Sequence, residues 1–443
     1  MEDTIAAVST PFGEGAIALI RLSGPSAISI AESVYRGKRR VSEMRPRLQH
    51  YGGLFDEDRK VDDVLLSVYR APASYTGDDV VEIGCHGGLL VTRRILDLLL
   101  KSGARSAEPG EFTQRAFLNG KMDLTQAEAV MDLISAQTDL ALRAAHEQLE
   151  GRLGSRIEAM REALLGLLAH VEAYIDFPDE DIDPDTGEAL LRRLDAVREE
   201  LDALLATAAR GRILREGVRT VIFGAPNVGK SSLLNLLLGY ERAIVSPTPG
   251  TTRDSIEEVI NLRGIPLRLI DTAGVRDASD AVERAGIERT LRQVERADLV
   301  LHLEDGSRPR SRETVADSSR ELLVLNKADL GEDPAWSGVD AVRISCMESD
   351  GLGALEEAIT AKIFGGHTAH RDWSVAINAR HQACLQLARK YADAARSALT
   401  DGLSAEFAAE ELRAALNAVG EVVGRVDTED LLGRIFSSFC IGK

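Results

Sequence analysis

The stretch FGAPNVGKSS (223–232) has the residue types and spacing that hold a nucleotide phosphate. It fits the pattern G-x-x-x-x-G-K-S, with Gly224, Gly229, Lys230 and Ser231 at the fixed places. The glycines let backbone N–H groups turn toward phosphate oxygens, the lysine adds charge at the β- and γ-phosphates, and the serine hydroxyl can bind Mg²⁺. The apolar strand RTVIFG precedes the motif and the helix SSLLNLLLG follows it. This context favours a phosphate loop over an ordinary glycine-rich turn.

Two further motifs could contact the metal and the γ-phosphate. DTAG follows the apolar run PLRLI, so Asp271 can hold the metal through water and the Gly274 N–H can meet the γ-phosphate. GTTRD precedes that run and carries Thr251 and Thr252. A threonine there can bind Mg²⁺ only while the γ-phosphate is present, which gives this loop the properties of a switch.

A fourth motif, NKAD, follows the strand ELLVLN and could select the base. The Asp329 carboxylate can accept from both N–H donors on one edge of guanine, whereas adenine would leave the carboxylate unpaired. The Lys327 stem can cover the face of the base. Taken alone, NKAD also fits an exposed strand end. Four motifs in this order predict a domain that binds and hydrolyses GTP.

Two residues raise questions about hydrolysis. Val275 follows Gly274, where many GTPases have a glutamine that orients the attacking water. Valine cannot form that hydrogen bond, so another group must position the water, and Glu283 and Glu288 are nearby in the sequence. Asn227, inside the phosphate loop, could bind a cation beside the phosphates, although loop geometry alone also explains it.

The pattern around these motifs predicts the elements that position them. From about Gly217, strands and helices alternate with glycine-rich turns, which indicates a doubly wound parallel sheet. Helices with one apolar stripe each flank this segment on both sides, which predicts one helical domain interrupted by an α/β domain. The stripes comprise Ile157, Met160, Leu164, Leu168 and Val171; Leu190, Leu194, Val197, Leu201 and Leu204; and Leu412, Leu416, Val419 and Val423.

The first 120 residues predict a mixed α/β region. GAIALIRLSG and VDDVLLSVYR have the pattern of strands, and GGLLVTRRILDLLLKSG that of a helix with Gly103 at its end. The chain has 443 residues, long enough for about three domains of ~150 residues.

Composition limits the class of protein. The net charge of −18 argues against a large nucleic-acid surface, and we interpret the basic cluster from Arg36 to Arg47 as a solvated loop. No apolar run approaches the ~20 residues of a membrane span, and the start MEDTIAAVST does not resemble a secretory signal. The four widely spaced cysteines indicate reduced thiols, so we expect a cytoplasmic protein.

The chain ends in CIGK, a cysteine four residues from the end. A prenylation box has an aliphatic residue before the last and usually a basic run upstream. Here Gly442 and Lys443 occupy the last two places and no basic run precedes them, which disfavours a lipid anchor.

These motifs, together with stretches near both ends, resemble the MnmE (TrmE) family of bacterial tRNA-modification GTPases. Five stretches look like hallmarks of that family: DTIAAVSTPFGEGAIALIRLSGPSA, SYTGDDVVEIGCHGG, PGEFTQRAFLNGKMDLTQAEAV, DTAGVRDASDAVERAGIE and CIGK. The N-terminal stretches and the terminal tetrad are specific to it, whereas the phosphate motifs are shared by many GTPases. The resemblance covers essentially the whole chain. It implies a multidomain protein with α/β and all-α parts.

The implied domains are an N-terminal α+β domain similar to aminomethyltransferases (1–120), a helical domain in two parts (121–216 and 373–443), and a Ras-like P-loop GTPase domain inserted into it (217–372). The first would bind tetrahydrofolate and dimerise.

By resemblance, GTP or GDP would contact most of the residues in the four motifs and the later SCM stretch. The set comprises Asn227, Val228, Gly229, Lys230, Ser231, Ser232, Ser246, Pro247, Thr248, Pro249, Gly250, Thr251, Thr252, Asp271, Thr272, Ala273, Gly274, Asn326, Lys327, Asp329, Ser345, Cys346 and Met347. The implied Mg²⁺ ligands are Ser231 and Thr252. The implied K⁺ ligands are Asn227, Ser246, Thr248 and Thr251, and that ion would replace an arginine finger when two GTPase domains meet. Glu283 would position the attacking water.

The resemblance also implies a site for a 5-formyl or 5,10-methylene tetrahydrofolate. Its residues would be Arg21, Glu82, Lys121 and Lys443, with Cys440 near the one-carbon group. From chemistry alone, the first two could be an ordinary ion pair and the third a solvated lysine. Whether Cys440 is a nucleophile, a proton donor or a packing residue stays open, because a thiol needs a lowered pKa to react.

Family members form homodimers and a heterotetramer with the FAD protein MnmG (GidA). Together they add an aminomethyl or carboxymethylaminomethyl group to C5 of the wobble uridine of certain tRNAs. A ribosome-assembly GTPase would share every phosphate motif but would not need a folate site.

The sequence departs from the family pattern in three places. Ser345–Met347 stands where Ser-Ala-Lys is usual, Pro247 and Pro249 stiffen the ion loop, and Cys85 replaces a histidine or small polar residue.

Overall fold

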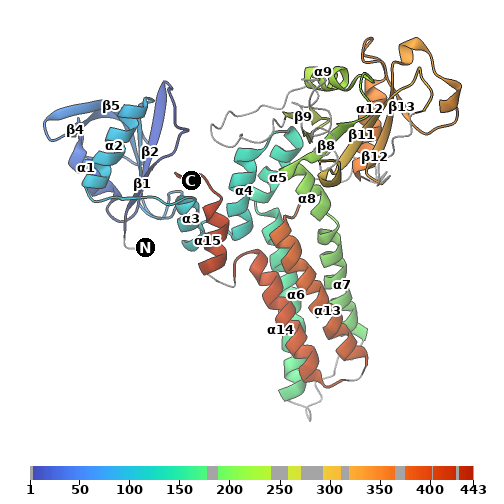
Figure 1. Cartoon of the computed structure of the whole chain (residues 1–443). Coiled ribbons are helices and arrows are strands. Elements are labelled where there is room, and N and C mark those ends of the chain that lie inside the picture. Colours follow the sequence, from blue (N-terminus) through green and yellow to red (C-terminus); the bar gives the residue numbers. More distant parts are fainter. Residues whose placement is uncertain are drawn as a thin grey trace. The chain divides into compact units, whose positions relative to one another are not determined.

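The computed structural model describes residues 3–176, 188–240, 258–270, 293–310, 319–364, 375–401, 403–425 and 429–442. The chain forms two compact units (Figure 1). The first contains residues 1–131, 149–198 and 387–443, and the second contains residues 132–148 and 199–386. Each unit is described by itself.

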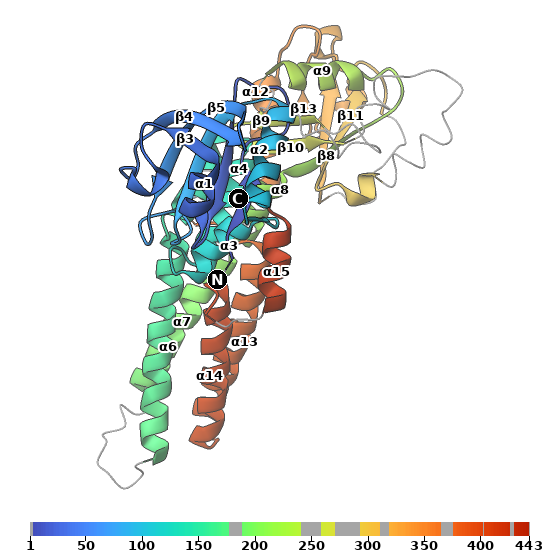
Figure 2. The same ribbon diagram turned by 90° about the vertical axis from the view of Figure 1, so that its left-hand side faces the viewer.

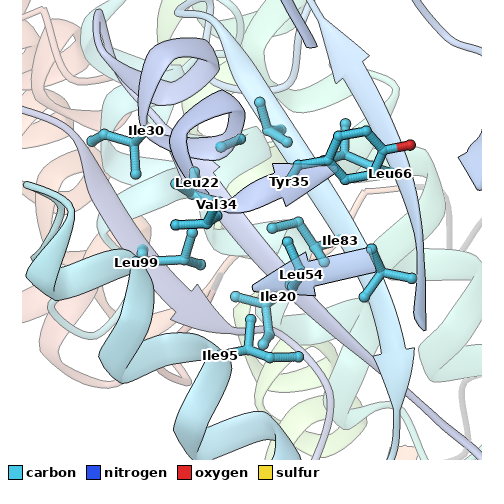
Figure 3. Close-up of a cluster of buried hydrophobic side chains, with 14 of the residues drawn as sticks. Ile20, Leu22, Ile30, Val34, Tyr35, Leu54, Leu66, Ile83, Ile95 and Leu99 are labelled. Atoms are coloured by element: carbon cyan, nitrogen blue, oxygen red, sulfur yellow. The ribbon is translucent and has the colours of Figure 1, made fainter. Parts of the chain in front are cut away.

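The N-terminal part of the first unit is a seven-stranded sheet in the order β3-β4-β5-β6-β2-β1-β7. Its strands are β1 (Ile5–Val8), β2 (Ile17–Ser23), β3 (Tyr35–Gly37), β4 (His50–Asp56), β5 (Arg59–Tyr69), β6 (Val80–His86) and β7 (Arg105–Ser106). Helices α1 (Ala27–Val34) and α2 (Leu89–Lys101) contribute to the same core. Strand residues such as Ile20 and Ile83 pack with Ile95 and Leu99 of α2, because alternate strand residues point to one face of the sheet (Figure 3).

The rest of the first unit is helical. Its elements are α3 (Glu111–Leu118), α4 (Leu124–Ser135), α6 (Arg152–Asp176), α14 (Ala405–Val422) and α15 (Glu429–Ser437), with the larger part of α7 (Glu188–Leu205) and α13 (Ala379–Thr400). Helices α6 and α14 run side by side in both views (Figures 1 and 2). Their predicted stripe residues form the contact: Ile157, Met160, Leu164, Leu412 and Val419 are all buried.

The second unit is built on a six-stranded sheet in the order β13-β12-β11-β8-β10-β9. Its elements are α5 (Asp139–Leu149), α8 (Ala208–Glu216), β8 (Val218–Phe223), α9 (Lys230–Tyr240), β9 (Glu258–Leu262), β10 (Ile265–Leu269), β11 (Leu299–Asp305), β12 (Glu321–Asn326), β13 (Val342–Arg343) and α12 (Leu352–Phe364). All neighbouring strands are parallel except β9 and β10. Three short 3₁₀ turns, η1 (Val41–Glu43), η2 (Ala328–Leu330) and η3 (Pro334–Trp336), complete the described elements.

The predicted fold class is confirmed: an α+β domain, a helical part and a P-loop α/β domain occur in one chain. The predicted strands at β2, β5, β8, β10 and β12 and the predicted helices α2 and α9 are all present. The three boundaries between the four predicted segments stay predictions. Among the described helices, none is long and apolar enough to cross a membrane.

Candidate functional site

The nucleotide motifs meet at one edge of the second unit's sheet. Strands β8, β11 and β12 are parallel neighbours, so their carboxyl ends lie at the same edge. The phosphate loop follows β8, Asp305 ends β11, and Asn326 ends β12. Open parallel sheets bind ligands at this edge, where the backbone leaves the strands.

The phosphate loop has a conformation that depends on its glycine and lysine. The Lys230 Nζ donates to the carbonyl oxygens of Gly224 and Ala225, both at 2.7 Å, which folds the lysine stem over the loop. Gly229 has φ +106°, and a Cβ there would lie 2.1 Å from the Asn326 Nδ2. Only glycine leaves room for Asn326 to approach the loop. Ser231, in the first turn of α9, is exposed beside it.

Asn326 connects the phosphate loop to the loop that follows β13. Its side-chain Nδ2 donates to the Val228 carbonyl at 2.8 Å, and its Oδ1 accepts from the Cys346 N–H at 3.1 Å. The residue is 3% exposed. The sequence motif identified Asn326 but not this bridging function, since neither of its partners belongs to the NKAD motif.

The residues predicted to select the base, Lys327 and Asp329, both have polar side-chain partners. Lys327 has φ +69° and its Nζ lies 2.7 Å from the Asp305 Oδ2. Burial would raise the pKa of Asp305, but hydrogen bonds from Lys327 and Ser307 outweigh it and hold the pKa below its usual value. The Ser345 hydroxyl donates to the Asp329 Oδ1 at 2.6 Å, which restrains this carboxylate.

The two side chains of the SCM stretch that depart from the family pattern, Cys346 and Met347, have different surroundings. Burial, together with the nearby charge of Asp329, raises the pKa of the Cys346 thiol to about 11, so the thiol is neutral at pH 7. Met347 is 84% exposed. Thus the Cys346 side chain is partly buried near Asp329, whereas the Met347 side chain points to solvent.

Several predicted site residues lie outside the described residues. They are Ser246, Pro247, Thr248, Pro249, Gly250, Thr251, Thr252, Asp271, Thr272, Ala273, Gly274, Glu283 and Lys443. The described part fits a nucleotide bound with Mg²⁺: a glycine cradle, a lysine over it and a serine hydroxyl at the start of a helix.

In the first unit, Arg21 and Glu82 form an ion pair. They are direct partners in the register of β2 and β6, with the Arg21 Nη2 2.7 Å from the Glu82 Oε1. The Tyr69 hydroxyl donates to the other carboxylate oxygen at 3.3 Å. The guanidinium also lies 5.5 Å from the ring centre of Tyr75 and 5.7 Å from that of Phe112. A cation flanked by aromatic rings can stack on a flat heteroaromatic ligand such as a pterin.

Lys121 does not join this group. Its Nζ donates to the Pro72 carbonyl at 3.0 Å. Thus the structure brings together two of the described residues predicted to bind folate, and Lys121 has a partner of its own.

The C-terminal tail is fixed to the N-terminal domain. The Gly110 N–H donates to the Cys440 carbonyl at 3.3 Å, and the Ser9 hydroxyl donates to the Gly442 carbonyl at 3.1 Å. Gly442 has φ +93°, and a Cβ there would lie 2.5 Å from the Val8 carbonyl oxygen. Gly110 bonds the tail, and Phe112, two residues further on, contacts the Arg21 guanidinium. The tail therefore lies near Arg21.

Packing of α15 explains why the tail is placed there. Leu432, Phe436 and Phe439 are buried against Leu124 and Ala127 of α4. The Cys440 side chain that follows is exposed. The tail is therefore held by a hydrophobic cluster and by backbone hydrogen bonds, with its thiol open to a ligand.

These features define a multidomain protein with a P-loop domain of the GTPase type. Residues 4–121 match the family model described as GTP-binding protein TrmE N-terminus, and residues 124–440 match the MnmE helical domain. A tRNA modification GTPase MnmE from Akkermansia muciniphila is 54% identical, with 100% of this chain and 99% of the relative covered. Another, from Natranaerobius thermophilus, is 45% identical with 100% of both chains covered. The chain belongs to the MnmE family.

Among solved structures, the G domain of the T. maritima FeoB iron transporter is 26% identical, covering 33% of this chain and 98% of its own, with a TM-score of 0.25. A score this low carries no argument about the fold.

Proposed function

We propose that this protein is a GTP-hydrolysing enzyme that modifies tRNA. With a partner of the MnmG type, it would add a carboxymethylaminomethyl or aminomethyl group to C5 of the wobble uridine, using a one-carbon unit from tetrahydrofolate. The combination of two sites in one chain of the MnmE family carries the proposal. One unit contains Asp329, a candidate guanine-binding carboxylate held by Ser345. The other unit contains the Arg21–Glu82 ion pair and the fixed C-terminal tail.

For hydrolysis, residues of this chain would bind and orient the nucleotide. Loop N–H groups and Lys230 would hold the phosphates, and Ser231 with Thr252 would hold Mg²⁺, which would supply positive charge at the phosphate oxygens. Asp329, fixed by Ser345, selects guanine. Glu283 positions the attacking water, which accounts for Val275 in place of glutamine.

Four residues of the chain would hold a potassium ion, which would supply positive charge beside the phosphates. Its ligands are Asn227, Ser246, Thr248 and Thr251. Of these, Asn227 is described, and its φ of +65° turns the backbone of the loop at that point. The ion site is completed when two GTPase domains associate, so we expect a homodimer.

For the modification step, Arg21 and Glu82 bind the folate head and Lys443 binds beside them. Cys440 lies at the one-carbon group with an exposed thiol. MnmG brings FAD and forms a heterotetramer with this chain in the cytoplasm. The hydrogen bonds to the Cys440 and Gly442 carbonyl groups support this position of the tail.

Calorimetry with 5-formyl-tetrahydrofolate tests the proposal against a ribosome-assembly GTPase, which shares the phosphate motifs but needs no folate site. We expect saturable binding by the wild-type chain and a loss of at least about tenfold in affinity for Arg21→Gln. Arg105→Gln is the matched control, because Arg105 lies in the same unit and also pairs with a glutamate, Glu111. No measurable binding to the wild type would favour the ribosome-assembly alternative.

A further inference from the structure

The basic cluster of the N-terminal domain lies on a segment whose conformation is fixed by the fold. We define the basic patch by its exposed residues: Arg36, Lys38, Arg39, Arg40, Arg45, Arg47 and Arg70. Between residues 36 and 47 the only acidic side chain is Glu43, whereas the whole chain has a net charge of −18. A polyanion approaching this protein would be repelled by most of its surface and attracted here.

The segment that carries the patch is anchored at its centre. Val41 and Met44 are 0% and 3% exposed, so the turn η1 packs against the hydrophobic core. The Ser42 N–H donates to the Glu32 carboxylate at 2.7 Å, and the Ser42 carbonyl accepts from the Arg70 guanidinium at 2.7 Å. The centre of the segment is therefore held by the core, while its cationic side chains remain exposed to solvent, as the sequence predicted.

The end of the segment is fixed in an unusual conformation. Arg47 has φ +63°, which L-residues rarely adopt. Its N–H donates to the Val68 carbonyl at 2.9 Å, and its guanidinium donates to the Ala73 carbonyl at 3.3 Å. Such backbone strain persists only where the surrounding structure holds it, and it is common at functional sites.

Three cations of the patch have no role in holding the fold. Among the described residues, no carboxylate lies within ion-pair distance of Lys38, Arg39 or Arg45, whereas Arg36 pairs with Asp58 at 3.3 Å. Unpaired, exposed cations on a fixed segment are free to contact an anionic ligand without first breaking an internal ion pair.

We propose that the basic patch is the surface on which the sugar–phosphate backbone of tRNA docks. This rests on the proposed function, which requires a tRNA substrate but leaves its docking surface unassigned. Arginine side chains match phosphate oxygens bidentately, and regularly exposed cations on a rigid segment suit a phosphate backbone. The side chains that define the patch are all cationic, whereas the centre of a protein–protein interface is mostly apolar.

Salt-dependent binding of a tRNA transcript tests this assignment. The variant is Lys38→Ala/Arg39→Ala/Arg45→Ala, and the matched control is Arg93→Ala/Arg94→Ala/Lys101→Ala on α2. Both remove three exposed cations of the same domain, and neither set has an ion pair among the described residues. Affinity is measured by fluorescence anisotropy between about 50 and 200 mM salt, with an unmodified transcript that has a wobble uridine.

We expect the patch variant to bind the transcript at least about tenfold more weakly, with the slope of log affinity against log salt reduced by roughly 2. The control should match the wild type, and both variants should retain wild-type melting temperature and GTP hydrolysis.

Three results would overturn the assignment: no binding of the transcript by the wild type, equal losses in the two variants, or weakened capture of the MnmG-type partner with tRNA binding unchanged. The last would make the patch a protein interface. If the wild type binds through the patch while wobble nucleosides in cells lacking the protein stay normal, the proposed function fails and the patch stands.

Discussion

Asn326 holds together the two loops that a guanine nucleotide must meet. One side-chain atom donates to the phosphate loop at Val228 and another accepts from the loop at Cys346. Both bonds involve backbone groups in a crowded place, where an unpaired polar group costs about 1–3 kcal/mol. The residue therefore links the phosphate contacts to the base contacts.

Replacing Asn326 should weaken both stability and nucleotide binding. For Asn326→Ala we expect a loss of about 1–3 kcal/mol in the free energy of unfolding and GDP affinity lowered roughly 10- to 100-fold, because the two loops lose their common anchor. Urea unfolding and titration with a fluorescent GDP measure these. Asn235→Ala, at an exposed position of α9, is the control and should change neither. Wild-type GDP affinity in Asn326→Ala would contradict the bridging function.

At the residue scale, the sequence could predict candidate nucleotide contacts but not the hydrogen bonds that hold those side chains. The spacing of Gly229 and Lys230 is a local property, so it is visible in a single stretch. The bond from Ser345 to Asp329 joins residues 16 positions apart, and that from Asn326 to Val228 spans 98 positions. Such contacts depend on strand order, which composition and periodicity do not encode.

At the element scale, local patterns predicted strands and helices well, because each amphipathic element must bury one face. The pairing of strands in the N-terminal sheet could not be predicted from these local patterns. Arg21 and Glu82 face each other only because β2 lies beside β6, 61 residues further on. Similarly, Ile441 forms an antiparallel β-bridge with Pro109, and no local pattern around either residue predicts this pairing.

The fixed tail gives a test that separates the two proposed activities. In Gly442→Ala, the new Cβ would lie 2.5 Å from the Val8 carbonyl oxygen in a backbone conformation with φ +93°, so the tail must move. We expect affinity for 5-formyl-tetrahydrofolate to fall roughly tenfold or more. The GTP hydrolysis rate should stay within about twofold, because the nucleotide site lies in the other unit.

The control for this prediction is Gly433→Ala in α15, where a Cβ would meet nothing within 4 Å. Alanine at a helical position should leave folate binding unchanged and stabilise the protein by up to about 1 kcal/mol. If Gly442→Ala abolished GTP hydrolysis as well, the tail would be a structural element of the whole chain.

At the scale of the whole molecule, hydrolysis is proposed to depend on an ion and on a second copy of the chain. We expect the rate of GTP hydrolysis to fall by roughly two orders of magnitude when Na⁺ replaces K⁺, since the proposed ion would take the place of an arginine finger. Glu283→Ala should lower the rate similarly in K⁺, whereas Glu288→Ala, five residues away, serves as the matched control. Steady-state phosphate release measures all four conditions, and equal rates in the two salts would contradict the ion mechanism.

The central claim is that the two units serve one reaction on tRNA. The most direct measurement is mass spectrometry of wobble nucleosides in tRNA from cells that lack this protein. The account predicts that the carboxymethylaminomethyl and aminomethyl groups disappear from C5 of the wobble uridine and return when the wild-type gene is restored. Unchanged wobble uridines in the cells lacking the protein would contradict it.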